Sequence, residues 1–103
     1  MPNSNYRAGR AFEYKRRKDW IRKGYEVVRS AGSHGVWDLC AVSIHHPEWP
    51  VLLIQLKRVE KESQGKLLLK RFKESPPLTP SSHYHLVMEV QVKGSKEVMS
   101  VEV

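Results

Sequence analysis

The 103-residue sequence predicts a single α/β domain in which two helices flank a sheet of five strands. Two observations lead to this prediction. Short apolar runs, several rich in β-branched residues, have the length and alternation of strands, whereas two longer segments show helical spacing. No internal repeat, low-complexity tract or long linker divides the chain, so we expect one domain over residues 1–103.

The first helix is expected at the start of the chain. Ser4 or Asn5 can cap its N-terminus, and it should run to about Lys23, where Gly24 supplies a stop. The run at residues 25–30 (YEVVRS) is short and β-branched, as in a strand. A glycine and serine loop (AGSHG) follows it.

An acidic residue lies on the apolar side of this helix. Phe12 and Trp20 follow helical spacing, and Glu13 falls on the same side as both. Glu13 therefore faces inward in this prediction. The alternative is a surface ion pair with Arg16 or Arg17, which would stabilise the helix only slightly.

Two predicted central strands carry polar residues within apolar runs. Residues 36–42 (VWDLCAV) are expected to form a strand with Asp38 in its middle, where a buried carboxylate needs a partner. Residues 51–57 (VLLIQLK) alternate with period 2, so Gln55 and Lys57 emerge side by side on one face. Pairing these strands through a short turn would bring a carboxylate, an amide oxygen and an ammonium group to one point.

The rest of the chain completes the sheet. A second, amphipathic helix is expected with Gly65, Leu68, Leu69 and Phe72 on one side and Lys66, Lys70, Arg71 and Lys73 around it. A proline-rich segment ends this helix. Residues 84–92 alternate cleanly, and a turn leads to residues 97–103, so we expect a terminal hairpin.

The charge of the chain favours a polyanionic partner. Eighteen Lys and Arg face eleven Asp and Glu, a formal net charge of +7. Residues 1–35 hold nine basic and three acidic side chains and residues 55–75 hold seven and three, so positive charge flanks the polar cluster. A solvated helix surface that only keeps the protein in solution is the alternative interpretation.

Other features argue against a membrane or a disulfide-bonded protein. No apolar run approaches the ~20 residues of a membrane span, and the basic N-terminus lacks a secretory hydrophobic region, so we expect a cytoplasmic location, or the host cytoplasm for a viral protein. Cys40 is expected to be a buried structural thiol. We interpret His45 and His46 as exposed loop residues, because no further metal-ligand spacing accompanies them.

The polar cluster has the composition of a divalent metal site. Mg²⁺ prefers hard oxygen ligands and is often held by one or two carboxylates together with a substrate phosphate. Asp38 and Glu13 would supply the charge, Gln55 and the backbone carbonyl of Leu56 neutral oxygens, and Lys57 could orient a water or neutralise developing charge. This arrangement suits phosphodiester hydrolysis.

The order of these residues resembles a known nuclease family. Glu13, then RSAGS at 29–33, GVWDL at 35–39 and IQLK at 54–57 resemble the PD-(D/E)XK nucleases, and within them the archaeal-type Holliday junction resolvases and their phage and bacterial relatives. The resemblance covers about two thirds of the chain. It implies a restriction-endonuclease-like fold with a central mixed five-stranded sheet, dependence on Mg²⁺ or Mn²⁺, a homodimer, and nicking of branched DNA such as a four-way junction.

The resemblance also assigns roles to individual residues. It implies that Glu13 and Asp38 are metal-site acids, that Lys57 is the catalytic lysine, and that Arg29 and Ser33 contact phosphate. Together with the ligand chemistry above, the expected catalytic set is Glu13, Ser33, Asp38, Gln55 and Lys57. The expected metal ligands are Glu13, Asp38, Gln55 and Leu56. The basic and loop residues expected to contact DNA are Arg10, Arg16, Arg17, Arg29, Ser30, Ser33, His34, Arg58 and Lys61.

Two departures from the family pattern define the alternatives. Trp37 stands where the motif usually has proline, and Gln55 replaces the second acid, which removes one negative charge from the metal site. The main expectation is a metal-dependent, structure-selective DNA endonuclease. The alternative is a catalytically weak or inactive DNA-binding module on the same fold. A basic RNA-binding or ribosome-associated domain would explain the charge but not the Asp38, Gln55 and Lys57 cluster.

Overall fold

The structure is a computed structural model that describes residues 4–30 and 36–103. Its elements follow in the order α1 (Ser4–Arg22), β1 (Glu26–Arg29), β2 (Leu39–Val42), β3 (Val51–Val59), α2 (Glu62–Glu74), β4 (His85–Val92) and β5 (Val98–Glu102). Neither helix, over the part described, is long and apolar enough to cross a membrane.

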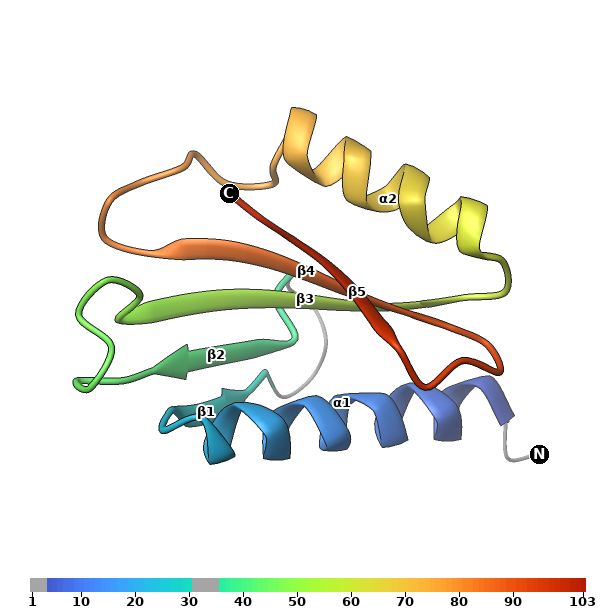
Figure 1. Ribbon diagram of the computed structural model, residues 1–103, viewed down its shortest axis with the longest axis horizontal. Coiled ribbons are helices and arrows are strands. Elements are labelled where there is room, and N and C mark those ends of the chain that lie inside the picture. The colour runs from blue at the N-terminus through green and yellow to red at the C-terminus, as the bar shows by residue number, and fades with distance from the viewer. Residues whose placement is uncertain (1–3, 31–35) are drawn as a thin grey trace.

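The five strands form one mixed sheet in the order β1-β2-β3-β4-β5. Only β3 and β4 are parallel, and the other three pairs are antiparallel. Helix α2 makes the crossover that a parallel connection requires. Figure 1 shows α1 along one side of the sheet and α2 along the other. The predicted α/β class, with two helices and a five-stranded mixed sheet, is therefore confirmed.

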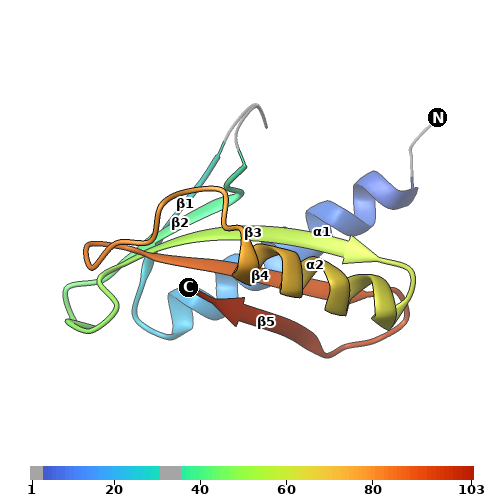
Figure 2. The same cartoon turned by 90° about the horizontal axis from the view of Figure 1, so that it is seen from above.

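The sheet has an apolar core on each face, because successive strand residues point to opposite sides. On the face of α1, Trp20 and Tyr25 pack against the even-numbered positions of β3, namely Leu52, Ile54 and the half-buried Leu56. On the face of α2, Phe72 packs with Leu86, Met88 and Val90 of β4 and with Leu53 and Val59 of β3. Figure 2 shows β3 and β4 side by side through the centre of the molecule. The two cores hold the helices on opposite faces.

A buried ion pair joins α1 to the middle of the sheet. Glu89 of β4 is 2% exposed, and Arg16 bonds both of its carboxylate oxygens, at 2.9 Å and 2.7 Å. Arg16 also contacts Asp19 at 2.8 Å, and its side chain is 12% exposed. The hydrogen bonds that Arg16 donates to Glu89 raise the pKa of Arg16. This pair fixes where α1 lies on the sheet.

Glycine allows the close approach of α2. A Cβ atom built on Gly65 would lie 2.3 Å from Met99 Cε and 3.1 Å from Val90 Cγ1, closer than side chains normally pack. Gly24, with a φ of +98°, ends α1 in the left-handed conformation that glycine adopts readily. The stop predicted at Gly24 is confirmed.

Two strand boundaries differ from the prediction by more than one residue. Strand β2 begins at Leu39, so Asp38 precedes the strand and does not lie in its middle. The reason is that Asp38 uses its side chain, and not only its backbone, to bond β3. Strand β3 runs to Val59, two residues beyond the predicted end, because it keeps pairing with β4 as far as Val92.

Part of the α2 face of the sheet carries exposed apolar groups. Val28 of β1 and Val42 of β2 are 64% and 42% exposed. Cys40, a free thiol expected to be buried, is only partly covered there, and burial raises its pKa. Helix α2 contacts β3, β4 and β5, which explains why the first two strands are less covered.

We predict that Glu89→Gln lowers the free energy of unfolding by about 2–3 kcal/mol, because Arg16 would lose the charge that compensates its burial. Urea denaturation followed by tryptophan fluorescence measures the change. The control is Glu102→Gln on the adjacent strand, where the exposed side chain should contribute less than about 0.5 kcal/mol. Equal losses in the two variants would show that the Arg16–Glu89 pair does not hold α1 on the sheet.

Candidate active site

Asp38 lies at the point where β2 begins, and three hydrogen bonds fix it. Its N–H donates to the carbonyl of Ile54 at 2.9 Å, and its own carbonyl accepts the N–H of Ser30 at 3.0 Å. Its carboxylate oxygen Oδ2 accepts the N–H of Leu56 at 2.7 Å. The side chain of Asp38 thus takes the place that a further β2 residue would fill beside β3.

This contact also orients the carbonyl group of Leu56. In an extended strand, the N–H and C=O of one residue point toward the same neighbouring strand. Because the Leu56 N–H points at Asp38, the Leu56 carbonyl oxygen lies on the same side of β3. A backbone oxygen and a carboxylate therefore share the edge of β3 beyond the start of β2.

The surroundings of Asp38 disfavour its charged form. Burial raises the pKa of the Asp38 carboxyl, and the nearby Glu13 carboxylate raises it further. The Leu56 N–H and the Lys57 ammonium act in the opposite direction and do not cancel the effect. Asp38 is thus within electrostatic reach of both Glu13 and Lys57, as the sequence predicted.

Glu13 reaches this region from the middle of α1 and is paired with Arg29. Nε of Arg29, the last residue of β1, contacts Oε1 of Glu13. The Glu13 side chain is 21% exposed and that of Arg29 42% exposed. The alternative partners considered from the sequence, Arg16 and Arg17, do not make this contact, because Arg16 is occupied by Glu89 and Asp19.

Gln55 and Lys57 approach from the other face of the sheet. They lie in register with Met88 and Val90 of β4, which belong to the core under α2. Partners in register point to the same face. The candidate site therefore lies across the edge of β3, with Glu13 on the α1 side and Gln55 and Lys57 on the α2 side. Asp38 joins the two sides at the edge.

The oxygen donors present fit a hard divalent cation. The Glu13 carboxylate is close enough to Asp38 to disfavour the charged form of Asp38. These two carboxylates and the Leu56 carbonyl are oxygen donors of the kind that Mg²⁺ or Mn²⁺ prefers. Over residues 4–30 and 36–103, no group of three Asp, Glu, His or Cys side chains forms a complete site. Gln55 adds an amide, and not a carboxylate, to the residues of this region.

Three arginines expected to contact DNA gather beside Glu13. A cavity of about 430 Å³ between α1 and β1 is lined by Arg10, Arg17 and Arg29, with Ala11, Glu13 and Tyr14. Arg16 does not join them, since its guanidinium group is held by Glu89 and Asp19. The guanidinium group of Arg16 is therefore already bonded within the protein, unlike an exposed side chain that could meet an external ligand. Ser30 is exposed at the end of β1, whereas Ser33 and His34 lie outside the described residues.

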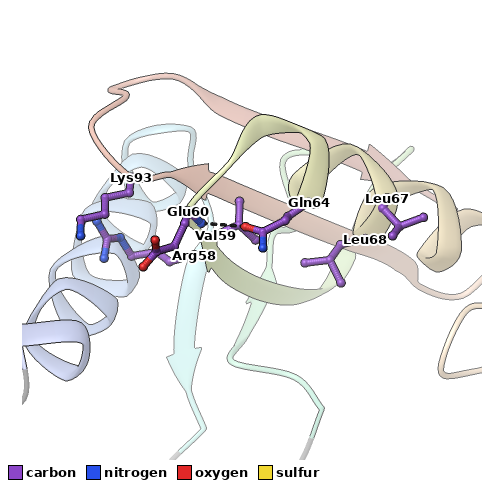
Figure 3. A pocket seen from close by; sticks show the side chains of 7 residues that line it. All are labelled: Arg58, Val59, Glu60, Gln64, Leu67, Leu68 and Lys93. Atoms are coloured by element: carbon purple, nitrogen blue, oxygen red, sulfur yellow. Dashed lines mark hydrogen bonds between the residues drawn. The ribbon is translucent and has the colours of Figure 1, made fainter.

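The remaining predicted contacts lie at the carboxyl ends of β3 and β4. A hollow of about 570 Å³ lies there. Figure 3 shows the side chains that line it, namely Arg58, Val59, Glu60, Gln64, Leu67, Leu68 and Lys93. Nε of Arg58 bonds Gln91 at 3.0 Å, and Lys61 is exposed at the start of α2. Lys93, which follows β4, was not predicted as part of this surface. Only the parallel pairing of β3 with β4 brings it next to Arg58.

The opposite end of β3 is built from aromatic contacts. His46, expected to be an exposed loop residue, stacks on Tyr25 at 4.6 Å between ring centroids, and its Nε2 lies 2.6 Å from the Lys23 carbonyl. Nε2 of His85 in β4 similarly lies 2.9 Å from the carbonyl oxygen of Glu48. His46 and His85 therefore hold the connection between β2 and β3, at the end of the sheet remote from Asp38.

Comparison with known proteins adds no relative. No family model matches the chain, and no curated protein matches it.

We predict that Asp38→Asn stabilises the protein at neutral pH, whereas Asp38→Ala is less stable than Asp38→Asn by about 1 kcal/mol. Asparagine keeps an oxygen for the Leu56 N–H without the desolvated charge, and alanine loses that hydrogen bond. The raised pKa means that the folded state binds the Asp38 proton more tightly than the unfolded chain.

Thermal unfolding at several pH values tests this prediction. As pH rises through the raised pKa, the wild-type protein should lose stability relative to Asp38→Asn, and below the pKa of the unfolded chain the difference should vanish. A difference that is independent of pH would mean that the Asp38 carboxylate is not disfavoured in the folded state.

Proposed function

We propose that the protein is a metal-dependent, structure-selective DNA endonuclease, similar to a Holliday junction resolvase, with a restriction-endonuclease-like fold. The observation that supports it most strongly is that Asp38, beside β3, lies within electrostatic reach of both Glu13 and Lys57. Three separate elements contribute these groups, and two like charges lie close together. Repulsion between like charges lowers the stability of the folded protein, and it is often found where a site binds a cation or catalyses a reaction.

Each residue has a role that its position supports. Mg²⁺ or Mn²⁺ would supply charge neutralisation and activation of water. Asp38 and Glu13 would hold the cation, with the Leu56 carbonyl and Gln55 as neutral donors. Lys57, exposed and within electrostatic reach of Asp38, would orient the attacking water or neutralise charge on the phosphate oxygens.

The DNA would bind through phosphate contacts. Arg10, Arg17 and Arg29 lie beside the candidate site, and Arg58, Lys61 and Lys93 lie at the carboxyl ends of β3 and β4. Contacts of this kind read the shape of a branched duplex more than its base sequence, and their affinity falls steeply with salt. Cleaving both strands of a junction needs two sites, so we propose that a homodimer binds the four-way junction.

The alternative is a DNA-binding module without activity on the same fold. Gln55 is the observation that favours it, because two carboxylates hold a divalent cation less tightly than three. Here the arginines would still bind DNA, and the Asp38 region would serve the fold alone. Cleavage measurements separate the two functions.

We predict that the protein cleaves a four-way junction in Mg²⁺ or Mn²⁺ and leaves a linear duplex of the same sequence intact. Asp38→Asn and Lys57→Ala should each lower the cleavage rate by about 100-fold or more while binding changes only a few-fold. The control, Lys66→Ala, removes an exposed charge from α2 and should cleave normally. Tight binding by the wild-type protein without cleavage in either metal would support the inactive module.

We further predict that Gln55→Glu tightens Mg²⁺ binding by roughly tenfold or more, because it restores a carboxylate beside Asp38. Isothermal titration calorimetry measures the affinity. The control is Gln64→Glu, which adds the same charge at the start of α2, where the residue 64 side chain caps the helix. Equal affinities in the wild-type protein and Gln55→Glu would show that residue 55 does not face the cation.

A further inference from the structure

We propose that Arg29 exchanges partners during binding. It neutralises Glu13 while no cation is bound, and it moves to a DNA phosphate when a divalent cation takes up the Glu13 carboxylate. The proposal rests on the metal-dependent function proposed above, and it assigns Arg29 a second role that couples the cation to the DNA.

The position of Arg29 supports this exchange. Arg29 ends β1, and the next residue, Ser30, donates its N–H to the carbonyl of Asp38. Glu13 comes from α1 and is close enough to Asp38 to raise the pKa of its carboxyl group. The guanidinium group of Arg29 thus sits on one of the two carboxylates that a cation would use. In the absence of a cation, the Arg29 guanidinium group supplies the positive charge that neutralises Glu13.

A guanidinium group and a divalent cation compete for such a carboxylate. Both are positively charged, so a cation bound between Glu13 and Asp38 would repel a guanidinium group that stayed in contact with Glu13. Arg29 is free to leave, because its side chain is 42% exposed and lies at the end of an edge strand. The Arg16–Glu89 pair differs in this respect, since Arg16 is 12% and Glu89 3% exposed.

The cavity between α1 and β1 provides the new partner. Its walls carry the guanidinium groups of Arg10, Arg17 and Arg29 around the single carboxylate of Glu13. Nε of Arg17 is buried and makes no hydrogen bond within the described part of the chain. Once a cation neutralises Glu13, the cavity becomes a site for an anion. Guanidinium groups pair with phosphate in a two-pronged geometry, so a phosphodiester of the DNA backbone is the ligand that fits.

Nuclear magnetic resonance can follow the exchange directly in the full chain. The Arg29 Nε–Hε signal reports the contact with Glu13, and the Leu56 amide reports Asp38. We expect Mg²⁺ alone to shift both signals with the same midpoint. The Arg16 Nε–Hε signal is the internal control and should not move, because Glu89 keeps Arg16 in place.

Each outcome is decisive. A shift of Leu56 without a shift of Arg29 would overturn the exchange and leave the proposed metal site intact. If neither signal moves at saturating Mg²⁺, the metal site is wrong and the exchange falls with it. A shift of both signals at different midpoints would also overturn the exchange, because one cation could not then displace Arg29.

A binding measurement without metal tests the same proposal independently. In EDTA, Glu13→Gln should release Arg29 and tighten binding of a fluorescein-labelled duplex by about fivefold or more, and Glu13→Gln with Arg29→Gln should lose that gain. The matched control is Glu26→Gln, which removes the same charge from the other end of β1. Equal gains for Glu13→Gln and Glu26→Gln, or a gain that survives Arg29→Gln, would show a general charge effect and overturn the exchange.

Discussion

The hydrogen bond from the Leu56 amide to the Asp38 carboxylate determines the geometry of the candidate site. It lets β2 begin at Leu39 while β3 continues to Val59, so the edge of β3 is open to side chains from other elements. The same bond turns the Leu56 carbonyl toward that edge. Because the carboxylate is held against the backbone, its desolvation cannot be relieved by rotation into water, and its charged form remains costly. A bound cation would remove that cost.

Two arginine–carboxylate pairs on α1 show how burial separates structure from function. Arg16 and Glu89 are almost fully enclosed and bonded through two atoms each, so breaking the pair would leave a buried charge without compensation. Arg29 and Glu13 are partly exposed and joined through one pair of atoms, so the cost of separating them is lower. One helix thus carries a buried ion pair to the sheet and, three residues earlier in sequence, a partly exposed ion pair.

Much of the fold followed from the sequence because its determinants are local. Alternation along residues 51–57 and 84–92 identified two strands, and Gly24 marked the end of α1 correctly. Contacts between distant residues were not predictable in this way. The pairing of Glu13 with Arg29 depends on how α1 lies over β1. The bond between Arg16 and Glu89 joins residues 73 positions apart, and no sequence pattern linked them. The start of β2 was misplaced because Asp38 bonds β3 through its side chain.

Gly65 has a consequence for how the packing of α2 can vary. Because residue 65 has no side chain, α2 rests almost directly on Val90 and Met99. A methyl group added at position 65 would have to displace the flexible end of Met99 and press on Val90. A shorter side chain at position 99 would make room for that methyl group. Substitutions at positions 65 and 99 are therefore expected to compensate one another, because the two residues share one space.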